Sequence, residues 1–439
     1  MSVRATNQRR GGCPGLSAPM PTGDGLLVRL IPIGTVALEA LAGLCAAART
    51  RGNGVIEITS RGSIQIRGLS AASAPRLAAE IAALGIAAED GVPVLTNPLT
   101  GIDAEEILDA GALAAKLRRA LADTSLAARL APKVSVAVDG GGTLDLAEAL
   151  AADVRLCAEA HNGAMWLRVS VGGHGASAVQ LGAVMPAQGV AAAMRLLEVI
   201  ARHGRDARAR GILAAEGLTP FRSVLSELIS PAVRESDDAE QNPRLLGNER
   251  KVDAIGMHRL RDGSLAAGIG LAFGHIDATS LERLIGAAAD VEASGMRTAP
   301  GRTLLTIGLT DETAPSFIAA AGRLGLVVRV DDPRRQVVAC AGAPVCASGH
   351  IAARALAPRI AESAGPFIGD RLVIHISGCA KGCAHPGPAA LTVVGTAAGC
   401  ALITNGSAGD RADNFVQTRE LPDAIARSAR ALAAEPGHV

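Results

Sequence analysis

The stretch that decides the fold reads VACAGAPVCASGH at residues 338–350 and VIHISGCAKGCAHPGP at residues 373–388. It holds two cysteine pairs inside loops rich in Gly, Ala and Pro. Small residues let the backbone approach an inorganic core, so that its N–H groups can reach the sulfurs. Zinc sites made of four thiolates usually have closer pairs, whereas a [4Fe–4S] cluster tolerates wider spacing. The pattern therefore predicts a [4Fe–4S] cluster on the two pairs, Cys340 and Cys346 (C-x5-C) and Cys379 and Cys383 (C-x3-C).

Two plainer interpretations of these cysteines stay open. Free cysteines are among the most buried residues, so the four could be core thiols. A disulfide would need an oxidising compartment, of which the sequence gives no sign. Four of the chain's eight cysteines nevertheless fall within this short stretch, which favours a shared ligand. Among the others, Cys45, Cys157 and Cys400 are expected to fill the core.

Length and composition set the broad class of the protein. A chain of 439 residues suggests about two to four domains. The formal net charge is +1 and aromatic residues make up 1%, with no Tyr, so neither a nucleic acid nor a membrane surface is an expected partner. The first residues contain no apolar segment typical of a secretory signal. We expect a cytoplasmic protein.

The longest uncharged segment, between Lys381 and Asp410, has the length of a membrane span. Prolines near its start and recurring Gly, Thr and Asn argue against a membrane helix. The runs ALTVVG and CALIT around TAAG instead predict two buried strands joined by a turn.

The chain contains an internal duplication. Residues 24–69 alternate as a strand, a helix and two strands, and residues 263–309 repeat that order with few gaps. PKVSVAVDGGG at 132–142 likewise resembles DRLVIHISGCA at 370–380, and VPVLTNPLT at 92–100 resembles VVRVDDPRR at 327–335. The residues between these units include a helix expected around LDLAEALAADVR and another expected to begin at Asp103, with Glu106 completing a capping box.

This pattern predicts an α+β fold built from two ferredoxin-like half-domains and two α/β domains. Only the second α/β domain keeps cysteines, because the first has DGGG where the second has SGCAKGC. A groove between the halves would suit a ligand of cofactor size. The expected divisions are 1–24 (a flap or tail), 25–91 (first half-domain), 92–247 (α/β domain without a cluster, ending in a polar linker at 233–250), 248–315 (second half-domain) and 316–439 (cluster domain).

The two cysteine pairs on a duplicated chain of this kind resemble the sulfite/nitrite reductase superfamily over residues 16–430. This resemblance implies that Cys340, Cys346, Cys379 and Cys383 hold a [4Fe–4S] cluster. In the reductases the last of these cysteines also bridges to sirohaem iron. The anion site of the reductases carries a Lys-x-Lys motif. Here Lys133 matches the first lysine and Ser135 stands at the position of the second, so one cation that would help to bind sulfite or nitrite is missing.

Three segments are similar to the precorrin-3B synthase family of aerobic cobalamin biosynthesis: residues 13–25, 132–142 and 375–395. The resemblance implies an oxygen-dependent monooxygenase that hydroxylates precorrin-3A at a meso carbon and closes a γ-lactone. It also implies a [4Fe–4S] cluster, with a mononuclear non-haem iron as a further option, and an N-terminal flap over the pocket. Without a dinucleotide-binding motif, the electron donor is expected to be external. The alternative is a sirohaem-dependent sulfite or nitrite reductase.

A tetrapyrrole with many carboxylates would need forked donors, which arginine supplies. Arg61, Gln65 and Arg67 share one parity along their strand and hence one expected face. A solvated charged face is the plainer interpretation. The candidates for substrate binding are Arg61, Gln65, Arg67, Arg29, Arg297, Arg302 and Lys133.

Two further residues lie beside the cysteines. Lys381 stands inside the C-x3-C motif, where its charge would raise the cluster potential, and His385 follows Cys383. His385 could instead cap a turn. For a non-haem iron the sequence offers only the H-x-D of His275 and Asp277, and Asp277 also suits a helix N-cap.

Overall fold

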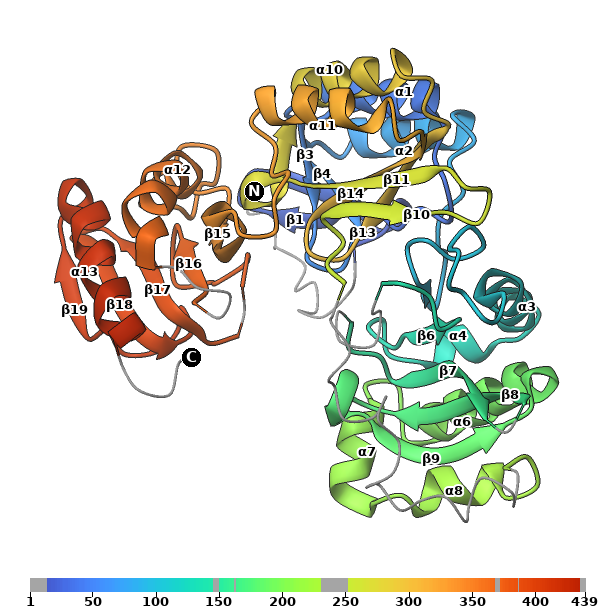
Figure 1. Cartoon of the computed structure of the whole chain (residues 1–439). Helices are drawn as coiled ribbons and strands as arrows, with labels where there is room; N and C mark the ends of the chain where they lie inside the picture. The colour runs from blue at the N-terminus through green and yellow to red at the C-terminus, as the bar shows by residue number, and fades with distance from the viewer. Residues whose placement is uncertain are drawn as a thin grey trace.

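The computed structural model describes residues 14–144, 150–161, 163–229, 252–367, 372–385 and 387–434 (Figure 1). Cys13, most of the predicted flap, the linker at 233–250 and the predicted boundary at 247–248 lie outside the described residues. The domain limits stay predictions. The described strands form four sheets, three of five strands and one of four.

The first half-domain is an antiparallel sheet covered by two helices. Its strand order is β1-β2-β4-β3, and β12 from the second half-domain extends the sheet beside β3. Its elements are β1 (Met20–Thr22), β2 (Gly25–Leu30), α1 (Leu38–Arg51), β3 (Val55–Ile58), β4 (Ile64–Leu69) and α2 (Ser73–Ala83).

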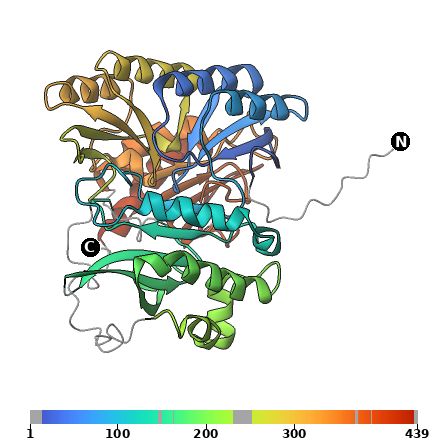
Figure 2. The ribbon, with the colours of Figure 1, turned by 90° about the vertical axis from the view of Figure 1, so that its right-hand side faces the viewer.

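The second half-domain repeats this plan, with the sheet order β10-β11-β14-β13. Its elements are β10 (Gly256–Arg259), β11 (Leu265–Gly270), β12 (His275–Asp277), α10 (Ala278–Ala289), β13 (Gly295–Ala299), β14 (Thr303–Leu309) and α11 (Ala314–Arg323). The helices of the two half-domains lie together across one side of the molecule (Figure 2). One hydrophobic core is shared by both half-domains. The half-domains therefore form a single structural unit.

The first α/β domain has three parallel strands followed by an antiparallel hairpin, in the order β5-β6-β7-β8-β9. Its strands are β5 (Val94–Thr96), β6 (Val136–Asp139), β7 (Val154–His161), β8 (Ala164–Val171) and β9 (Val179–Val184). Its helices are α3 (Ala110–Ala122), α4 (Leu126–Arg129), α6 (Gly189–Arg202), α7 (Ala209–Glu216) and α8 (Thr219–Leu225).

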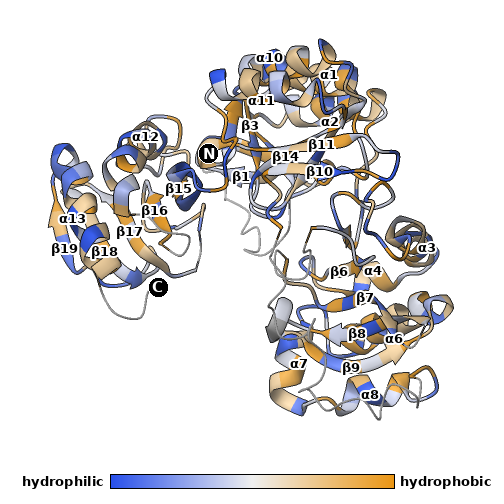
Figure 3. Ribbon diagram, in the orientation of Figure 1, coloured by the Kyte–Doolittle hydropathy of each residue, from blue (hydrophilic) through white to orange (hydrophobic). Residues whose placement is uncertain are grey.

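The second α/β domain has the same strand order and directions, β15-β16-β17-β18-β19. Its elements are β15 (Val337–Ala339), α12 (Ala353–Ala364), β16 (Ile374–Ser377), β17 (Ala389–Thr396), β18 (Gly399–Gly406), β19 (Asn414–Val416) and α13 (Leu421–Ala434). Helix α13 is hydrophilic over part of its surface and hydrophobic over the rest, as expected of a helix packed on a sheet (Figure 3). The two matching topologies confirm the predicted duplication.

Two local predictions were wrong. Helix α3 begins at Ala110 with Asp109 as its N-cap, whose carboxylate accepts from Ala112 N at 2.9 Å, so Asp103 caps no helix. Residues 145–149 of the helix expected around LDLAEALAADVR lie outside the described residues, so this helix stays a prediction, and Val154 begins β7. The strand equivalent to β5 in the second α/β domain is β15, at residues 337–339. The sequence had instead aligned residues 92–100, which contain β5, with residues 327–335, which precede β15. Short strands flanked by variable loops carry too little pattern to fix such a register.

The long uncharged segment forms the hairpin β17–β18, as predicted. None of the helices in the described part of the chain has the length and apolar character needed to cross a bilayer.

Each α/β domain packs on the half-domain of the other copy. The first packs on the second half-domain through a small apolar core, whose buried members are Leu99, Leu144, Leu260, Ala266, Ala299, Leu305 and Ile307. The second approaches the first half-domain, where Arg354 pairs with Glu57 and Ala347 N donates to Gly23 O at 2.9 Å. The first interface therefore contains an apolar core, and the second contains an ion pair and a backbone hydrogen bond at the equivalent place.

Candidate functional site

The four predicted cluster cysteines line one cavity of about 620 Å³. Cys340 follows β15 and Cys379 follows β16, and these strands are parallel neighbours, so both loops leave the same edge of the sheet. Cys346 and Cys383 lie further along the two loops. We call this space the inner cavity. Its opposite wall comes mainly from β2, β3, β4 and the segment before β2 of the first half-domain, and Phe273, Gly274 and Arg302 of the second half-domain complete the lining.

The backbone approaches two of the sulfurs closely. Gly378 N donates to Cys340 Sγ at 3.0 Å, and a Cβ on Gly378 would lie 3.4 Å from that sulfur. A Cβ on Gly23, which comes from the far side of the cavity, would lie 2.2 Å from Cys346 Sγ, closer than any side chain can be. These contacts are those that the small residues around the motif led us to expect.

Burial raises the pKa of the Cys340 and Cys383 thiols, and the neighbouring thiols raise both further. Hydrogen bonds from backbone N–H groups act in the opposite direction at Cys340, and Arg67 does so at Cys383. A metal ligand must be a thiolate, so iron would replace the protons that burial retains. Four thiols that border one cavity and affect one another electrostatically fit a cluster in which each iron takes one cysteine.

For a single metal ion the donors would have to converge on one point. Within the described residues no three His, Cys, Asp or Glu side chains do so. Asp277 is the N-cap of α10 and accepts from Ser280 N at 2.9 Å. His275 is largely buried, which lowers its pKa. The described residues therefore offer no ligand set for the non-haem iron that the resemblance allowed.

Three neighbouring strands of the first half-domain place Arg29, Gln65 and Glu57 in a row on the cavity wall. With its amide oxygen toward β2, Gln65 accepts from Arg29 Nη2 at 2.6 Å and donates to Glu57 Oε2 at 3.0 Å. The shared parity of Arg61, Gln65 and Arg67 corresponds to a shared surface, since all three line the cavity.

Arg67 is engaged by carboxylates of the protein itself. Its Nε and Nη2 donate to the two oxygens of Asp24 at 2.8 Å each, and its Nη1 lies 3.7 Å from Glu57. The Asp24 side chain is 2% exposed and that of Arg67 14% exposed. Burial alone would raise the pKa of Asp24, but hydrogen bonds from Arg67 and Thr22 outweigh it and lower that pKa. Glu57 also pairs with Arg354 at the start of α12.

Arg302 lines the same cavity but, unlike Arg67, is not paired with a carboxylate of the described residues. Its guanidinium makes no hydrogen bond or ion pair within the described residues, and burial alone lowers its pKa. Its backbone is left-handed, with φ of 64°. Arg61 lines the cavity at another point and donates to the carbonyl of Ala151 in the first α/β domain.

The structure places two other substrate candidates outside this cavity lining. Arg297 donates to Thr35 Oγ1 at 2.7 Å and to the carbonyls of Pro98 and Thr100 at 3.0 and 2.8 Å. Burial lowers its pKa to about 10. Lys133 is exposed beside β6. Their proposed roles in substrate binding stay predictions.

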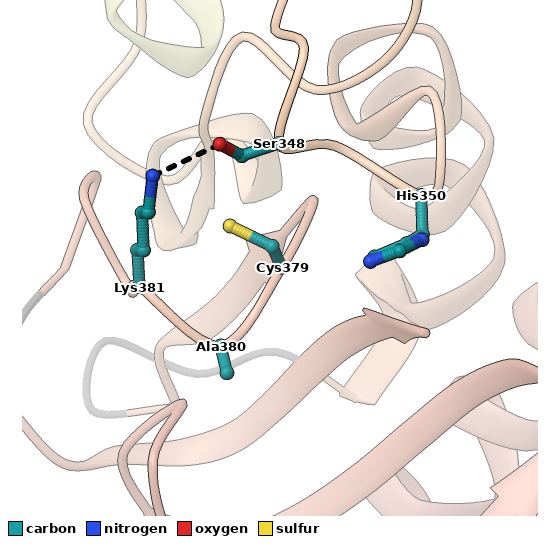
Figure 4. A pocket seen from close by; sticks show the side chains of 5 residues that line it. All are labelled: Ser348, His350, Cys379, Ala380 and Lys381. Carbon is teal, nitrogen blue, oxygen red and sulfur yellow. Dashed lines mark hydrogen bonds between the residues drawn. The ribbon is translucent and has the colours of Figure 1, made fainter. Parts of the chain in front are cut away.

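A second, outer hollow of about 970 Å³ adjoins the cysteine loop that contains Cys379. It is lined by Ser348, His350, Cys379, Ala380 and Lys381 (Figure 4). Lys381 Nζ donates to Ser348 Oγ at 2.9 Å, which ties the two cysteine loops together. Cys379, Lys381 and Ser348 line the inner cavity as well, so the two spaces share part of their lining.

His385 lies beside the loop, with its Nε2 3.1 Å from Pro388 O. Its ring centroid is 5.7 Å from that of His375 on β16. His375 is 0% exposed, and neither ring nitrogen has a hydrogen-bond partner. Burial, together with nearby His385 and Arg302, lowers its pKa to about 4. Of the other cysteines, Cys45 and Cys400 are buried and Cys157 is partly buried, and all described cysteines are free thiols.

Sequence reasoning missed Gly23, Asp24, Glu57 and Arg354. The first two lie in the turn between β1 and β2, within the segment 1–24 that was predicted to be a flap or tail. Strand β1 pairs with β2, and its residues line the cavity. The TGDG sequence was a turn signal, but nothing in it indicated which sulfur or arginine the turn would meet.

Comparison with known proteins places this arrangement in a family. The model of the nitrite/sulfite reductase ferredoxin-like half domain matches residues 18–84. The structure of the Mycobacterium tuberculosis NirA protein superposes with a TM-score of 0.71 at 20% identity, covering 94% of this chain and 82% of that one. The shared fold is therefore that of the sulfite/nitrite reductases.

Two curated relatives distinguish the branches. A ferredoxin–nitrite reductase of Synechococcus elongatus is 25% identical over 77% of this chain and 70% of its own length. A precorrin-3B synthase of a Sinorhizobium species is 36% identical over 97% of this chain and 89% of its own. With near-complete coverage at this identity, the chain belongs to the precorrin-3B synthase family.

Proposed function

We propose that this protein is an oxygen-dependent monooxygenase that converts precorrin-3A to precorrin-3B in aerobic cobalamin biosynthesis. The family relationship supports the activity. The observation that carries the proposal at the site is that four thiols and a cationic wall border one cavity. Its volume of about 620 Å³ falls within the usual range for small-molecule sites.

Cys340, Cys346, Cys379 and Cys383 would hold a [4Fe–4S] cluster, which supplies electrons one at a time when it is bound. The electrons would come from an external donor. In the overall reaction, molecular oxygen takes up two electrons and two protons. One oxygen atom enters the product as the meso hydroxyl, and the other leaves as water, while the acetate carboxylate supplies the oxygens of the lactone.

The chain's own residues would bind and orient the macrocycle. Arg302 is the best placed to receive a substrate carboxylate, because it lines the cavity and its guanidinium has no partner within the described residues. Arg29, Arg61 and Gln65 line the same cavity from the first half-domain. A guanidinium binds carboxylate through two parallel hydrogen bonds, which fixes orientation as well as affinity. Lys381 and His385 stay candidates for a role beside the cluster.

A sirohaem-dependent sulfite or nitrite reductase is the alternative. Its support is weaker, since those relatives are 21–26% identical and cover less of the chain, for example 41% in the sulfite reductase of Mycobacterium tuberculosis. The reductase would show strong sirohaem absorption and reduce sulfite with an artificial donor. The monooxygenase should show only a broad cluster spectrum.

The deciding experiment incubates the anaerobically purified protein with precorrin-3A, a reductant and oxygen, followed by mass spectrometry. We expect a mass gain of one oxygen atom, labelled when ¹⁸O₂ is supplied. Oxygen consumption without labelled product, or sulfite reduction by a sirohaem-containing protein, would contradict the proposal.

A further inference from the structure

The turn between β1 and β2, residues Gly23 and Asp24, belongs to the wall around the cysteines although it lies more than 300 positions away in the sequence. Gly23 O accepts from Ala347 N at 2.9 Å, next to Cys346. The Cα of Gly23 faces Cys346 Sγ so closely that a methyl group would overlap the sulfur, at 2.2 Å. The turn therefore covers one side of the cysteine site with bare backbone.

The same turn fixes a cation beside the sulfurs. Asp24 holds Arg67 through two hydrogen bonds of 2.8 Å, and both side chains are largely buried. Arg67 lines the cavity together with Cys346 and Cys383, and it interacts electrostatically with both. Because Asp24 occupies the guanidinium's fork, Arg67 is poorly placed to take a substrate carboxylate.

We propose that the Gly23–Asp24 turn and Arg67 are positioning residues of the cluster: Gly23 shields the Cys346 side from oxygen, and Arg67, held by Asp24, is a counter-cation of the cluster. This rests on the proposed function, because it requires the cluster. The backbone of Gly23 packs against Cys346 Sγ and leaves no room for a small molecule on that side of the sulfur, which limits its side reactions with oxygen. A fixed positive charge nearby favours the reduced, more negative cluster.

The first test compares Gly23→Ala with Gly15→Ala, a glycine of the same segment whose added Cβ would have no neighbour within 4 Å. The readout is the loss of cluster absorbance in the purified protein, without substrate, in air and under nitrogen. We expect Gly23→Ala to lose its cluster at least tenfold faster in air, with a much smaller difference under nitrogen, while Gly15→Ala follows the wild type. Equal decay of both variants in air, or equal acceleration with and without oxygen, would overturn the shielding role.

The second test measures the cluster's reduction potential in Arg67→Gln and Arg67→Lys. Loss of the charge should lower the reduced-to-oxidised ratio at a fixed potential about tenfold, which is about 59 mV for one electron. Arg67→Lys, which keeps the charge, should stay near the wild type. An unchanged potential in Arg67→Gln, or equal shifts in both variants, would overturn the counter-cation role. A wild-type protein without any cluster would instead contradict the proposed function.

Discussion

Arg67 and Arg302 border the same cavity, and their surroundings give them different tasks. Arg67 is bound by Asp24 and lies near Glu57, whereas Arg302 has no partner for its guanidinium within the described residues. An arginine whose donors are already satisfied contributes little to a new carboxylate, while a desolvated, unpaired one gains a full charge-assisted hydrogen bond. Substrate affinity should therefore depend on Arg302.

We expect Arg302→Gln to weaken binding of precorrin-3A about 10- to 100-fold, the value of one or two charge-assisted hydrogen bonds. Anaerobic titration followed by absorbance measures it without turnover. The exposed Arg283→Gln on α10 is the control and should bind normally. If Arg302→Gln binds like the wild type while keeping its cluster, the carboxylate site lies elsewhere.

His375 makes stability depend on pH. Its folded pKa of about 4 is below the ordinary value of 6.5, so the unfolded chain binds the proton more readily. The stability of the folded state therefore falls as pH drops through 6.5 toward 4. Between pH 7.5 and 5.5 the loss should be about 1 kcal/mol.

His375→Phe should remove this part of the pH dependence at little cost, because neither ring nitrogen has a hydrogen bond to lose. Urea unfolding of the two proteins under anaerobic conditions at both pH values gives the comparison. An identical pH slope in wild type and variant would show that His375 is charged or bonded in the folded protein.

At the level of residues, the sequence predicted that the four cysteines would gather at one site and that Gln65 and Arg67 would share one face of their strand. Both predictions follow from short-range spacing. It could not predict that Arg67 would be bound by Asp24, 43 positions earlier, or that Glu57 would meet Arg354, 297 positions later. Such pairs depend on how separate elements are packed. The same limit applies to Gly23, whose close contact is with a distant sulfur.

The loops that follow β5 and β15 are equivalent elements with different contents. After β15 the loop carries Cys340 and Cys346. After β5 the loop carries Asp103, which accepts from Thr143 N at 2.7 Å, from Thr143 Oγ1 at 2.8 Å and from Glu105 N at 3.0 Å. Asp103 is buried, so a carboxylate holds together the loops that a cluster would hold in the other copy.

We expect Asp103→Ala to lower the free energy of unfolding by about 2–4 kcal/mol, because it leaves buried donors without an acceptor. Cluster absorbance should be unchanged, since the loop belongs to the domain without cysteines. Urea unfolding measures the loss, with the exposed Asp90→Ala as the control. A variant that loses its cluster while keeping its stability would contradict this division between the two copies.

Elements with strong periodicity were predicted well, including the helices of both half-domains and the hairpin β17–β18. The capping box at Asp103 and Glu106 was wrong because helix α3 begins only at Ala110, with Asp109 as its N-cap. Glu106 accepts from Gly101 N at 2.7 Å and from Ala110 N at 3.3 Å, and does not close a box with Asp103. A carboxylate three residues before another one suits both arrangements, and the sequence does not distinguish them.

In the whole molecule, the pseudo-twofold arrangement gives equivalent strands different surroundings at the two interfaces. Leu305 and Ile307 on β14 fill the first, whereas Gln65 and Arg67 on the equivalent strand β4 border the cavity at the second. The sequence predicted the duplication, but it did not indicate that each α/β domain would pack on the half-domain of the other copy. That choice depends on tertiary contacts between distant segments.

Removal of the proposed cluster should therefore affect the two halves unequally. After anaerobic chelation of iron, we expect the second α/β domain to unfold several degrees lower, since it loses a bound ligand that the first never had. Calorimetry of the holo- and apo-proteins should show one transition shifting and a second one staying. A uniform shift of the entire profile would mean that the copies unfold together.

Cys379 and Lys381 line both the outer hollow and the inner cavity. Under the proposed function, an external electron donor that docks over the outer hollow would contact the loop that carries Cys379 while the macrocycle occupies the inner cavity. Reduction of the cluster would then not require release of the product first.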